Sequence, residues 1–477
     1  MTAIYSARWV LPVASPPIEN GAVAVAGETI AGVGAREDLV ARFPHAVATD
    51  FGASVLLPGL VNAHSHLELT VMRGFLESVE TDFFAWLRKL TVARLSMTGD
   101  DLFVSAACGA IEAARAGITC VGDSSSASAQ SMKALREIGV RGIVYQESFG
   151  PDPQLADENI AKLREQLAEM RALESAHVRA GVSPHAPYTV SAPQLELIAQ
   201  LALDENLPLM MHAAESEAEA LFIFEGTGPF ADGLRARGID WQAQKISTIE
   251  YLARHGVLGT RPLLAHCITV NDADIEKIRS AGAGVAHCPK SNAKLRHGRA
   301  PFARLLAANL NLGLGSDSVA SNNNCDILEE ARFATLLARA DRGSSPTVRE
   351  GLLPNDDALA DARATAPLTA KSQTEVCAND ALFAATLGGA RALGLDGQIG
   401  SLAEGMQADL IAVALDGAHQ QPSTNVVDAL IFSSSGRDVR MTMVAGKEVY
   451  RNGRVATASE KELHSRLQTV RQKIDGV

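Results

Sequence analysis

Residues 56–68, LLPGLVNAHSHLE, hold an apolar run that ends in two histidines separated by one residue. A short, continuously apolar run is typical of a strand that is buried on both faces of a parallel sheet. Side chains alternate along a strand, so His64 and His66 are expected to point to the same side. Two imidazoles on one side make half of a site for a divalent metal ion.

Short apolar runs of this kind recur between about Leu57 and Leu395, where they alternate with Ala-, Leu-, Glu- and Arg-rich stretches of helical length. The further runs are GITCVGD (117–123), VRGIVYQE (140–147), VRAGVSPHA (178–186), LPLMMHAAE (207–215), RPLLAHC (261–267), AGAGVAHCP (281–289) and LNLGLGSDS (310–318). With the first run, they predict a βα repeat of eight parallel strands. The pattern favours an α/β fold with a (β/α)₈ barrel over residues 58–395. A doubly wound open sheet is the alternative, but no GxGxxG motif follows an early strand.

The two ends of the chain differ from this middle part. Residues 1–57 and 396–477 hold short β-rich segments and turns, with little helical periodicity. We expect them to pair into one small β-sandwich domain. The expected turns lie at Glu19-Asn20-Gly21, Gly27-Glu28, Ala445-Gly446-Lys447 and Arg451-Asn452-Gly453. The polar, proline-bearing stretch 340–377 is predicted to be a mobile loop or lid.

Composition excludes several classes of function. Lys plus Arg total 43 and Asp plus Glu total 55 in 477 residues, which gives a net charge of −12 with histidine neutral. No basic run is present, so nucleic-acid binding is disfavoured. The six cysteines form neither a CxxC pair nor a dense framework, which indicates reduced thiols. No uncharged apolar run approaches the roughly 18–20 residues of a membrane span, and no secretory leader is recognisable. We expect a cytoplasmic protein that does not bind membranes.

Polar residues close several of the later apolar runs. His212 and Glu215 follow the fifth run, His266 follows the sixth, and Asp317 follows the eighth. In a β/α barrel the carboxyl ends of all strands converge on one rim, so residues far apart in sequence can meet there. Three neutral imidazoles and a carboxylate suit Zn²⁺, and also Fe²⁺.

Each of these residues, taken alone, also has a structural interpretation. A lone HxH pair arises readily by chance in a chain of this length. His212 or His266 alone is more often a hydrogen-bonded core histidine, and Asp317 after Gly-Ser is a typical helix N-cap. The ordered recurrence of all of them at strand ends favours the metal site.

Several stretches together resemble the amidohydrolase superfamily. They are PGLVNAHSHLELT (58–70), SPHAPYT (183–189), MHAAES (211–216), AHC (265–267), HCPKSNAKL (287–295), GLGSDSVASNN (313–323) and GSLAEGMQADLIAV (400–413). The resemblance covers nearly the whole chain. Within the superfamily, it is to the branch with adenosylhomocysteine and methylthioadenosine deaminases, aminofutalosine deaminases, guanine deaminase and triazine chlorohydrolases.

This resemblance implies a ligand set and a mechanism. It places the metal on His64, His66, His212 and Asp317, and it makes Glu215, His266 and Asp317 catalytic. The ion would activate water to hydroxide, and Asp317 would accept the proton of that water. Glu215 would protonate the ring nitrogen of the substrate, for which burial would have to raise its pKa. His266 would hold the hydroxide by a hydrogen bond.

Glu215 also has a purely structural interpretation, because it belongs to an acidic stretch at the start of a helix. Its neighbours Glu217 and Glu219 are expected to be only solvated carboxylates of that helix. Of the three glutamates, Glu215 is selected because it lies three residues after the ligand His212.

The fourth strand bears on the number of metal ions. Binuclear members of the superfamily carry a carboxylated lysine or a Glu at its end, whereas this chain has His185 and no lysine. One divalent ion is therefore expected. His185 resembles a substrate-binding histidine, and its alternative interpretation is a loop residue flanked by prolines. His287 resembles a structural position of the seventh strand.

The implied substrate is an amino-substituted purine nucleoside or related N-heterocycle, aminofutalosine-like or adenosylhomocysteine/methylthioadenosine-like. The chain departs from adenosylhomocysteine deaminases in lacking their Pro-x-Glu after the first strand. It also carries Gln146-Glu147 where those enzymes have an Arg. Alternatives are a chlorohydrolase or a formimino or cyclic-amide hydrolase on the same metal site; a non-catalytic binding protein is the least favoured. A homodimer is expected by family analogy alone.

Overall fold

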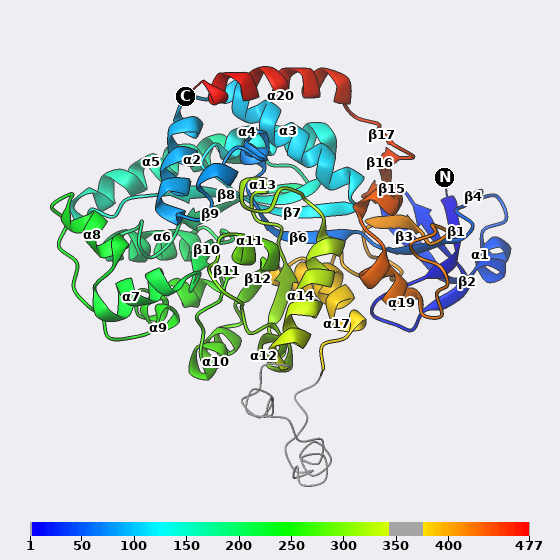
Figure 1. Ribbon diagram of the computed structural model, residues 1–477. Coiled ribbons are helices and arrows are strands. Elements are labelled where there is room, and N and C mark those ends of the chain that lie inside the picture. The colour runs from blue at the N-terminus through cyan, green and yellow to red at the C-terminus, as the bar shows by residue number, and fades with distance from the viewer. Residues whose placement is uncertain (1, 343–374, 477) are drawn as a thin grey trace, which may run out of the picture.

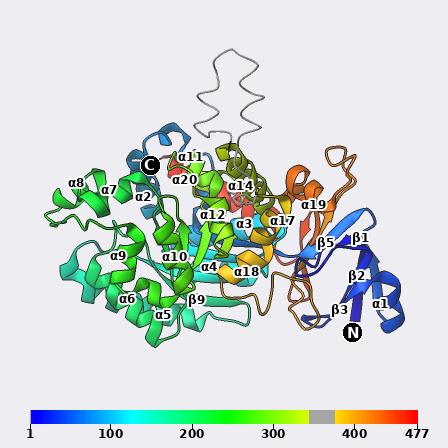
Figure 2. The same ribbon diagram turned by 90° about the horizontal axis from the view of Figure 1, so that it is seen from below.

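The computed structural model describes residues 2–342 and 375–476. Most of the stretch 340–377, for which the composition predicts a loop or lid, lies outside the described residues. Figures 1 and 2 show a barrel of strands surrounded by helices, with a separate sheet from both chain ends beside it. In the described parts of the chain, no helix is long and apolar enough to cross a bilayer.

The predicted parallel strands are present, and each overlaps the apolar run that predicts it. They are β6 (Leu60–Ser65), β7 (Ile118–Ser125), β8 (Arg141–Ser148), β9 (Val178–Pro184), β10 (Met210–Ala213), β11 (Leu263–His266), β12 (Gly284–His287) and β13 (Asn311–Leu314). β6 to β9 form one four-stranded sheet and β10 to β13 form another, and all ladders within them are parallel. Isolated parallel bridges between Val182 and Leu209 and between Ser65 and Asp317 join the two sheets into a closed barrel.

Helices follow the strands and pack outside them. The longer helices of the barrel region are α2 (Phe83–Leu95), α3 (Gly99–Arg115), α4 (Ser128–Ile138), α5 (Ala156–Ala172), α6 (Ala192–Asp204), α7 (Glu217–Glu225), α10 (Asp272–Ala281) and α14 (Ile327–Arg342). Shorter ones are α8 (Pro229–Arg235), α9 (Thr248–Arg254), α11 (Pro289–Lys294), α12 (Phe302–Ala307), α13 (Val319–Asn322), α17 (Ala378–Phe383) and α18 (Gly389–Ala392). The segment η1 (Leu67–Met72) is a 3₁₀ helix directly after β6.

Small and medium apolar side chains fill the inside of the barrel at one end. A cluster of buried residues joins Val61, Cys120, Ile143 and Met210, which come from four different strands, with Ala390 of α18. Because α18 contacts β6, β12 and β13, it closes the amino end of the barrel. The opposite end, at the carboxyl ends of the strands, is where β/α barrels carry their active sites.

The two chain ends pair into one small β domain, as their β-rich segments predict, and its strands form a single nine-stranded sheet. Its strands are β1 (Thr2–Val10), β2 (Ile18–Ala26), β3 (Thr29–Ala35), β4 (Val47–Asp50), β5 (Ser54–Pro58), β14 (Leu410–Ala414), β15 (Val439–Val444), β16 (Lys447–Arg451) and β17 (Arg454–Val455). The two ends meet where β5 pairs antiparallel with β14. Helix α1 (Arg36–Arg42) packs on β1, β2 and β3 of this sheet, and the short helix α19 (Val426–Asp428) packs against α17.

Three of the four predicted turns are confirmed. Gly27-Glu28 connects β2 to β3, and the two later turns connect β15 to β16 and β16 to β17. The turn predicted at Glu19-Asn20-Gly21 is wrong, because these residues lie inside β2. Asn20 has a φ of 50° there, a local distortion within a continuing ladder with β1.

The last helix, α20 (Glu460–Asp475), leaves the sheet and lies along α3 (Figure 1). Val470 and Ile474 share an apolar cluster with Leu69 and Trp86 of the barrel region. Arg466 and Lys473 form ion pairs with acidic residues at the start of α3. The domain limits at 57/58 and 395/396 stay a prediction.

A buried ion pair fastens the sheet to the barrel. Arg141 of β8 donates from Nε and Nη2 to the two carboxylate oxygens of Asp409, each at 3.0 Å. Asp409 precedes β14, and its Oδ1 also accepts the backbone N–H of Ala445 at 2.8 Å. Both side chains are almost completely buried. A buried pair of this kind costs desolvation when formed, but it is costly to break from one side.

We therefore expect Asp409→Ala to lower the free energy of unfolding by about 3–5 kcal/mol, because it leaves the Arg141 charge buried without its partner. Urea unfolding followed by circular dichroism measures this change. The control is Arg36→Gln, which breaks the exposed pair with Asp50 in the same sheet and should cost no more than about 1 kcal/mol. Equal effects of the two substitutions would contradict the proposed anchoring role.

Candidate metal and catalytic site

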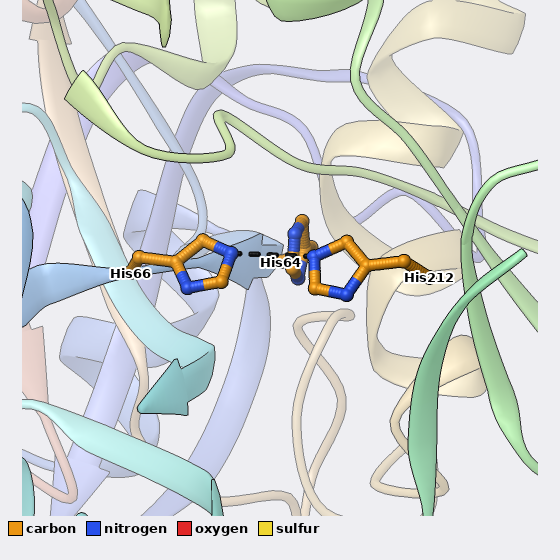
Figure 3. A group of neighbouring side chains, drawn as sticks. All are labelled: His64, His66 and His212. Carbon is orange, nitrogen blue, oxygen red and sulfur yellow. Dashed lines mark hydrogen bonds between the residues drawn. The ribbon is translucent and has the colours of Figure 1, made fainter. Parts of the chain in front are cut away.

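The residues predicted to hold a metal lie together at the carboxyl end of the barrel. His64 belongs to β6, His66 follows this strand, His212 belongs to β10, and Asp317 lies just after β13. Figure 3 shows the rings of His66 and His212 facing each other, with His64 between them. The strands bring these side chains together from positions far apart in the sequence.

Their polar atoms are close enough to share one ion. Nε2 of His66 lies 3.3 Å from Nε2 of His212. Oδ1 of Asp317 lies 3.4 Å from Nε2 of His64 and 3.5 Å from Nε2 of His66. One ligand atom from each of the three histidines lies within 4.8 Å of the others.

The state of His64 fits a metal ligand. Both of its ring nitrogens are buried, and neither has a hydrogen-bond partner among the described residues. Buried polar atoms are nearly always partnered, so an orphaned imidazole at this place points to a bound ion. Burial lowers the pKa of His64 to about 4, and it holds the pKa of His212 well below its ordinary value. Neutral imidazole is the form that binds metals.

Asp317 is held as a carboxylate. Burial alone raises its pKa, but the close contact with His64 and the charges of His266 and His66 bring it well below its ordinary value. Ser291 and Ser321 donate hydroxyl hydrogen bonds to Oδ2 at 2.5 and 3.0 Å. Oδ1 is therefore the oxygen that faces the histidines.

The backbone around the site is strained. Asp317 has a φ of 57°, His266 has 74° and Ala214 has 53°, all in the left-handed region that non-glycine residues avoid. Such conformations persist where the surrounding structure enforces them, and they cluster at functional sites. The hydrogen bond from Asp317 N to His64 O, at 2.9 Å, is one such constraint.

Glu215 and His266 lie beside this cluster, as the sequence predicts. Glu215 Oε1 lies 3.6 Å from Nε2 of His266, and Tyr188 donates its hydroxyl to Oε2 at 3.4 Å. His266 Nδ1 contacts the amide oxygen of Asn292 at 2.8 Å. An amide oxygen only accepts, so this contact places hydrogen on Nδ1 and leaves Nε2 toward Glu215.

The expectation that burial raises the pKa of Glu215 is wrong. Burial does act in that direction, but the charges of the nearby His266 and His297 outweigh it and lower the pKa. His297 Nδ1 lies 3.4 Å from Glu215 Oε1. His297 ends no apolar run, so nothing in the sequence pattern marks it.

The interpretation of Glu219 as a solvated carboxylate is also wrong, whereas Glu217 is exposed as expected. Glu219 is fully buried. Its two oxygens accept the backbone N–H groups of Ala214 and Glu215 at 2.7 and 3.1 Å. It thus supports the strained turn that carries Glu215.

His185 lies just beyond β9, and its ring centroid is 4.7 Å from that of His212. Its backbone oxygen contacts Nδ1 of His212 at 2.9 Å, which leaves Nε2 of His212 toward the cluster. Burial lowers the pKa of His185 to about 3. His287, by contrast, packs on Phe302 at the side of the barrel.

Glu147, at the end of β8, is a site residue that sequence analysis does not single out. It is buried, its Oε1 has no hydrogen-bond partner among the described residues, and it lies 3.7 Å from Nδ1 of His66. Burial raises its pKa to about 7. Its strand-end position is the signal that marks it, the same one that marks His212 and His266. Glu147, His185 and His212 form a second possible metal group, but it shares His212 with the first.

A cavity of about 400 Å³ lies at the carboxyl end of the barrel, and the site residues that line it are His66, Glu147, His185, His212, Glu215, His266 and Asp317. Its walls are Leu69, Phe83, Trp86, Leu87, Leu90, Thr91, Phe149, Tyr188, Thr189 and Leu295, with Glu68, Arg94, Ser126 and Ser318 among them. Polar groups that converge at one end of a largely apolar cavity are typical of a small-molecule site.

Comparison with known proteins gives the same picture. The amidohydrolase family matches residues 55–449, and a bacterial imidazolonepropionase-like composite domain matches residues 21–46. A 5-methylthioadenosine/S-adenosylhomocysteine deaminase of Syntrophobacter fumaroxidans is 31% identical over 459 residues, 96% of this chain and 94% of that protein. A 5′-deoxyadenosine deaminase of Methanothermobacter thermautotrophicus is 30% identical over 416 residues, 86% of each chain.

Solved structures share the fold over the whole chain. An adenosine deaminase from Xanthomonas campestris with bound zinc has a TM-score of 0.83 at 28% identity, covering 100% of this chain and 99% of that one. An atrazine chlorohydrolase from Arthrobacter aurescens, complexed with zinc, has a TM-score of 0.80 at 20% identity, covering 98% and 100%. The latter likeness concerns the fold alone. The extent of these matches, together with the barrel and its histidines, shows that the chain belongs to the amidohydrolase family.

Proposed function

We propose that this protein is a metal-dependent hydrolytic deaminase that releases ammonia from an amino-substituted purine nucleoside. One observation carries the proposal: His64, His66, His212 and Asp317 converge beside the Glu215–His266 pair at one end of the cavity. The names of the relatives, which are deaminases of adenosine derivatives, support this class of substrate.

The four converging residues would hold one divalent ion, for which we propose zinc, as in the related adenosine deaminase structure. When bound, such an ion lowers the pKa of its water and makes hydroxide available near neutral pH. We propose a single ion because the two possible histidine groups share His212.

Asp317 and Glu215 divide the proton transfers between them. Hydrolysis needs one proton of the attacking water at the ring nitrogen and the other on the departing amine. Because neighbouring histidines lower the pKa of Glu215, it begins as a carboxylate. It therefore takes a proton from the water and passes it to the ring nitrogen. Asp317 Oδ1 takes the second proton and gives it to the leaving ammonia.

His266 and His185 would act on the substrate. Nε2 of His266 is buried without a hydrogen-bond partner among the described residues, so it is available to the attacking oxygen. His185 lines the same cavity next to Phe149, with ring centroids 4.7 Å apart, which suits contact with a flat heterocycle. The pairing of Glu215 with His266 favours deamination over halide release, because loss of an amine requires proton delivery.

We further propose that the protein works in the cytoplasm as a homodimer. All six cysteines are unpaired thiols, and five of them are buried, which suits a reducing compartment. The dimer rests on family analogy.

Glu215→Gln should lower the rate of ammonia release by at least about 100-fold, because the amide cannot carry the proton. The matched control is Glu217→Gln, an exposed carboxylate at the start of α7, which should leave the rate unchanged. Metal content measured by mass spectrometry should stay the same in both variants. Retained turnover in Glu215→Gln would remove this residue from its role.

The purified protein should contain one zinc ion per chain, and it should release ammonia from 5′-deoxyadenosine, methylthioadenosine or S-adenosylhomocysteine. The variants His64→Ala and Asp317→Asn should lose both bound metal and activity. A chelator should abolish the activity of the wild-type protein, and added zinc should restore it. His419→Ala, at an exposed histidine of the β-sheet region, serves as the control. Metal-free material with full activity would overturn the proposal. Release of chloride from triazines or ammonia from formiminoglutamate alone would favour the alternatives.

A further inference from the structure

A second cavity lies at the amino end of the barrel, opposite the metal and catalytic site. Its volume is about 520 Å³, and its walls come mainly from the beginnings of β9, β11, β12 and β13, the loop before β10, and the end of α18. The ladders place three of its lining residues, Leu263, Gly284 and Asn311, level with one another at the starts of adjacent strands. No described residue of the proposed metal and proton-transfer site lines this cavity.

The charged side chains of this second cavity are mostly basic, although the whole chain carries a net charge of −12. Arg179 of β9, Arg261 before β11 and Arg391 of α18 line it, and Asp396 is the one acidic lining residue in the described parts of the chain. Asp396 partly neutralises Arg391, since its Oδ2 lies 3.8 Å from the Nε of that arginine. A concave wall with an excess of one charge attracts small ions of the other sign.

Two of these arginines have no protein partner. The guanidinium groups of Arg179 and Arg261 make no hydrogen bond or ion pair with any residue in the ranges 2–342 and 375–476. Each carries five N–H donors in a planar fork, which matches the oxygens of a phosphate or a carboxylate. Both residues are exposed, so an anion takes these donors from water without breaking a contact within the protein.

Tyr145 of β8 adds an unpartnered donor at the inner wall of the second cavity. This residue is 2% exposed, it lines the cavity, and its hydroxyl makes no hydrogen bond to any described residue. Burial raises the pKa of Tyr145, and the positive charge of Arg179 opposes that rise, so the two groups lie near each other. A buried hydroxyl is costly unless a polar group accepts from it. The hydroxyl and the guanidinium groups together point to a ligand with several oxygen acceptors.

We propose that the second cavity binds a small phosphate monoester. A phosphate dianion has oxygens on several sides and can accept from Arg179, Arg261 and Tyr145 together, whereas the two oxygens of a carboxylate match one planar fork. Charge agrees with this choice, because three arginines against one aspartate leave a net charge of +2 on the wall. The volume of about 520 Å³ is typical of cavities that hold small organic molecules, so the ligand carries an organic group beside its phosphate.

Calorimetric titration of the holoenzyme tests this site and needs no turnover. The probes are phenyl phosphate, inorganic phosphate and benzoate, in a phosphate-free buffer of low ionic strength. We expect the Kd of phenyl phosphate to be at least about 10-fold lower than the Kd of either other probe. Equal binding of inorganic phosphate would overturn the assignment to a monoester, and equal binding of benzoate would overturn the preference for phosphate. Absence of phenyl phosphate binding would overturn the whole inference.

Variants assign the binding to the second cavity. Arg179→Gln and Arg261→Gln should each weaken phenyl phosphate binding about 10- to 100-fold, because each removes charged hydrogen bonds. Tyr145→Phe should weaken it about 3- to 10-fold without lowering the Tm, because no described residue pairs with that hydroxyl. The matched control is Arg237→Gln, at an exposed arginine shortly after α8 that has no ion pair within the described residues; it should leave the Kd unchanged.

The proposed metal site is the other place where a phosphate can bind, and two variants separate the two sites. The double variant Arg179→Gln/Arg261→Gln should lose phenyl phosphate binding and still release ammonia at the wild-type rate, because neither arginine lies at the catalytic end of the barrel. His64→Ala should bind phenyl phosphate with the wild-type Kd. Binding that is kept in the double variant and lost in His64→Ala would place the anion on the metal and overturn the inference.

Discussion

The hydrogen bond from Asp317 N to His64 O is the contact on which the site depends. It belongs to the junction where the last strand of the barrel meets the first, next to the isolated bridge between Ser65 and Asp317. Without this closure, the carboxylate after β13 and the histidines of β6 would sit at opposite edges of an open sheet. Closure of the barrel is therefore what makes a four-residue cluster from distant parts of the chain.

This contact requires a strained backbone and a buried carboxylate at Asp317, and the surrounding residues offset their free-energy cost. Asp317 adopts a left-handed backbone, and its carboxylate is buried among histidines. Ser291 and Ser321 stabilise the carboxylate by hydrogen bonds, and Glu219 does the same for the backbone turn before Glu215. The ring nitrogens of His64 have no hydrogen-bond partner among the described residues, and these interactions do not offset that desolvation cost. A bound cation would supply the missing partner, so folding and metal binding are coupled at this position.

The cavity beside the metal site has two chemically different ends. At one end the histidines, Asp317 and Glu215 supply acid–base chemistry, and the other is lined by side chains of α2, namely Phe83, Trp86, Leu87, Leu90, Thr91 and Arg94. The second end is built by the segment between β6 and α3, and α20 packs against the same segment from outside. Such a division lets the reacting groups stay fixed on the barrel while the segment between β6 and α3 varies.

From the sequence alone one can predict the barrel, the pairing of the chain ends and the strand-end positions of His64, His66, His212, His266 and Asp317. Local apolar runs mark buried strands, and the convergence of strand ends is a property of the topology. The charge state of Glu215, the burial of Glu219 and the contacts of Glu147 were decided only by tertiary structure. Each depends on which groups from other elements come within a few ångströms, such as His297 near Glu215. Distances of that kind follow from packing, and no spacing along the chain encodes them.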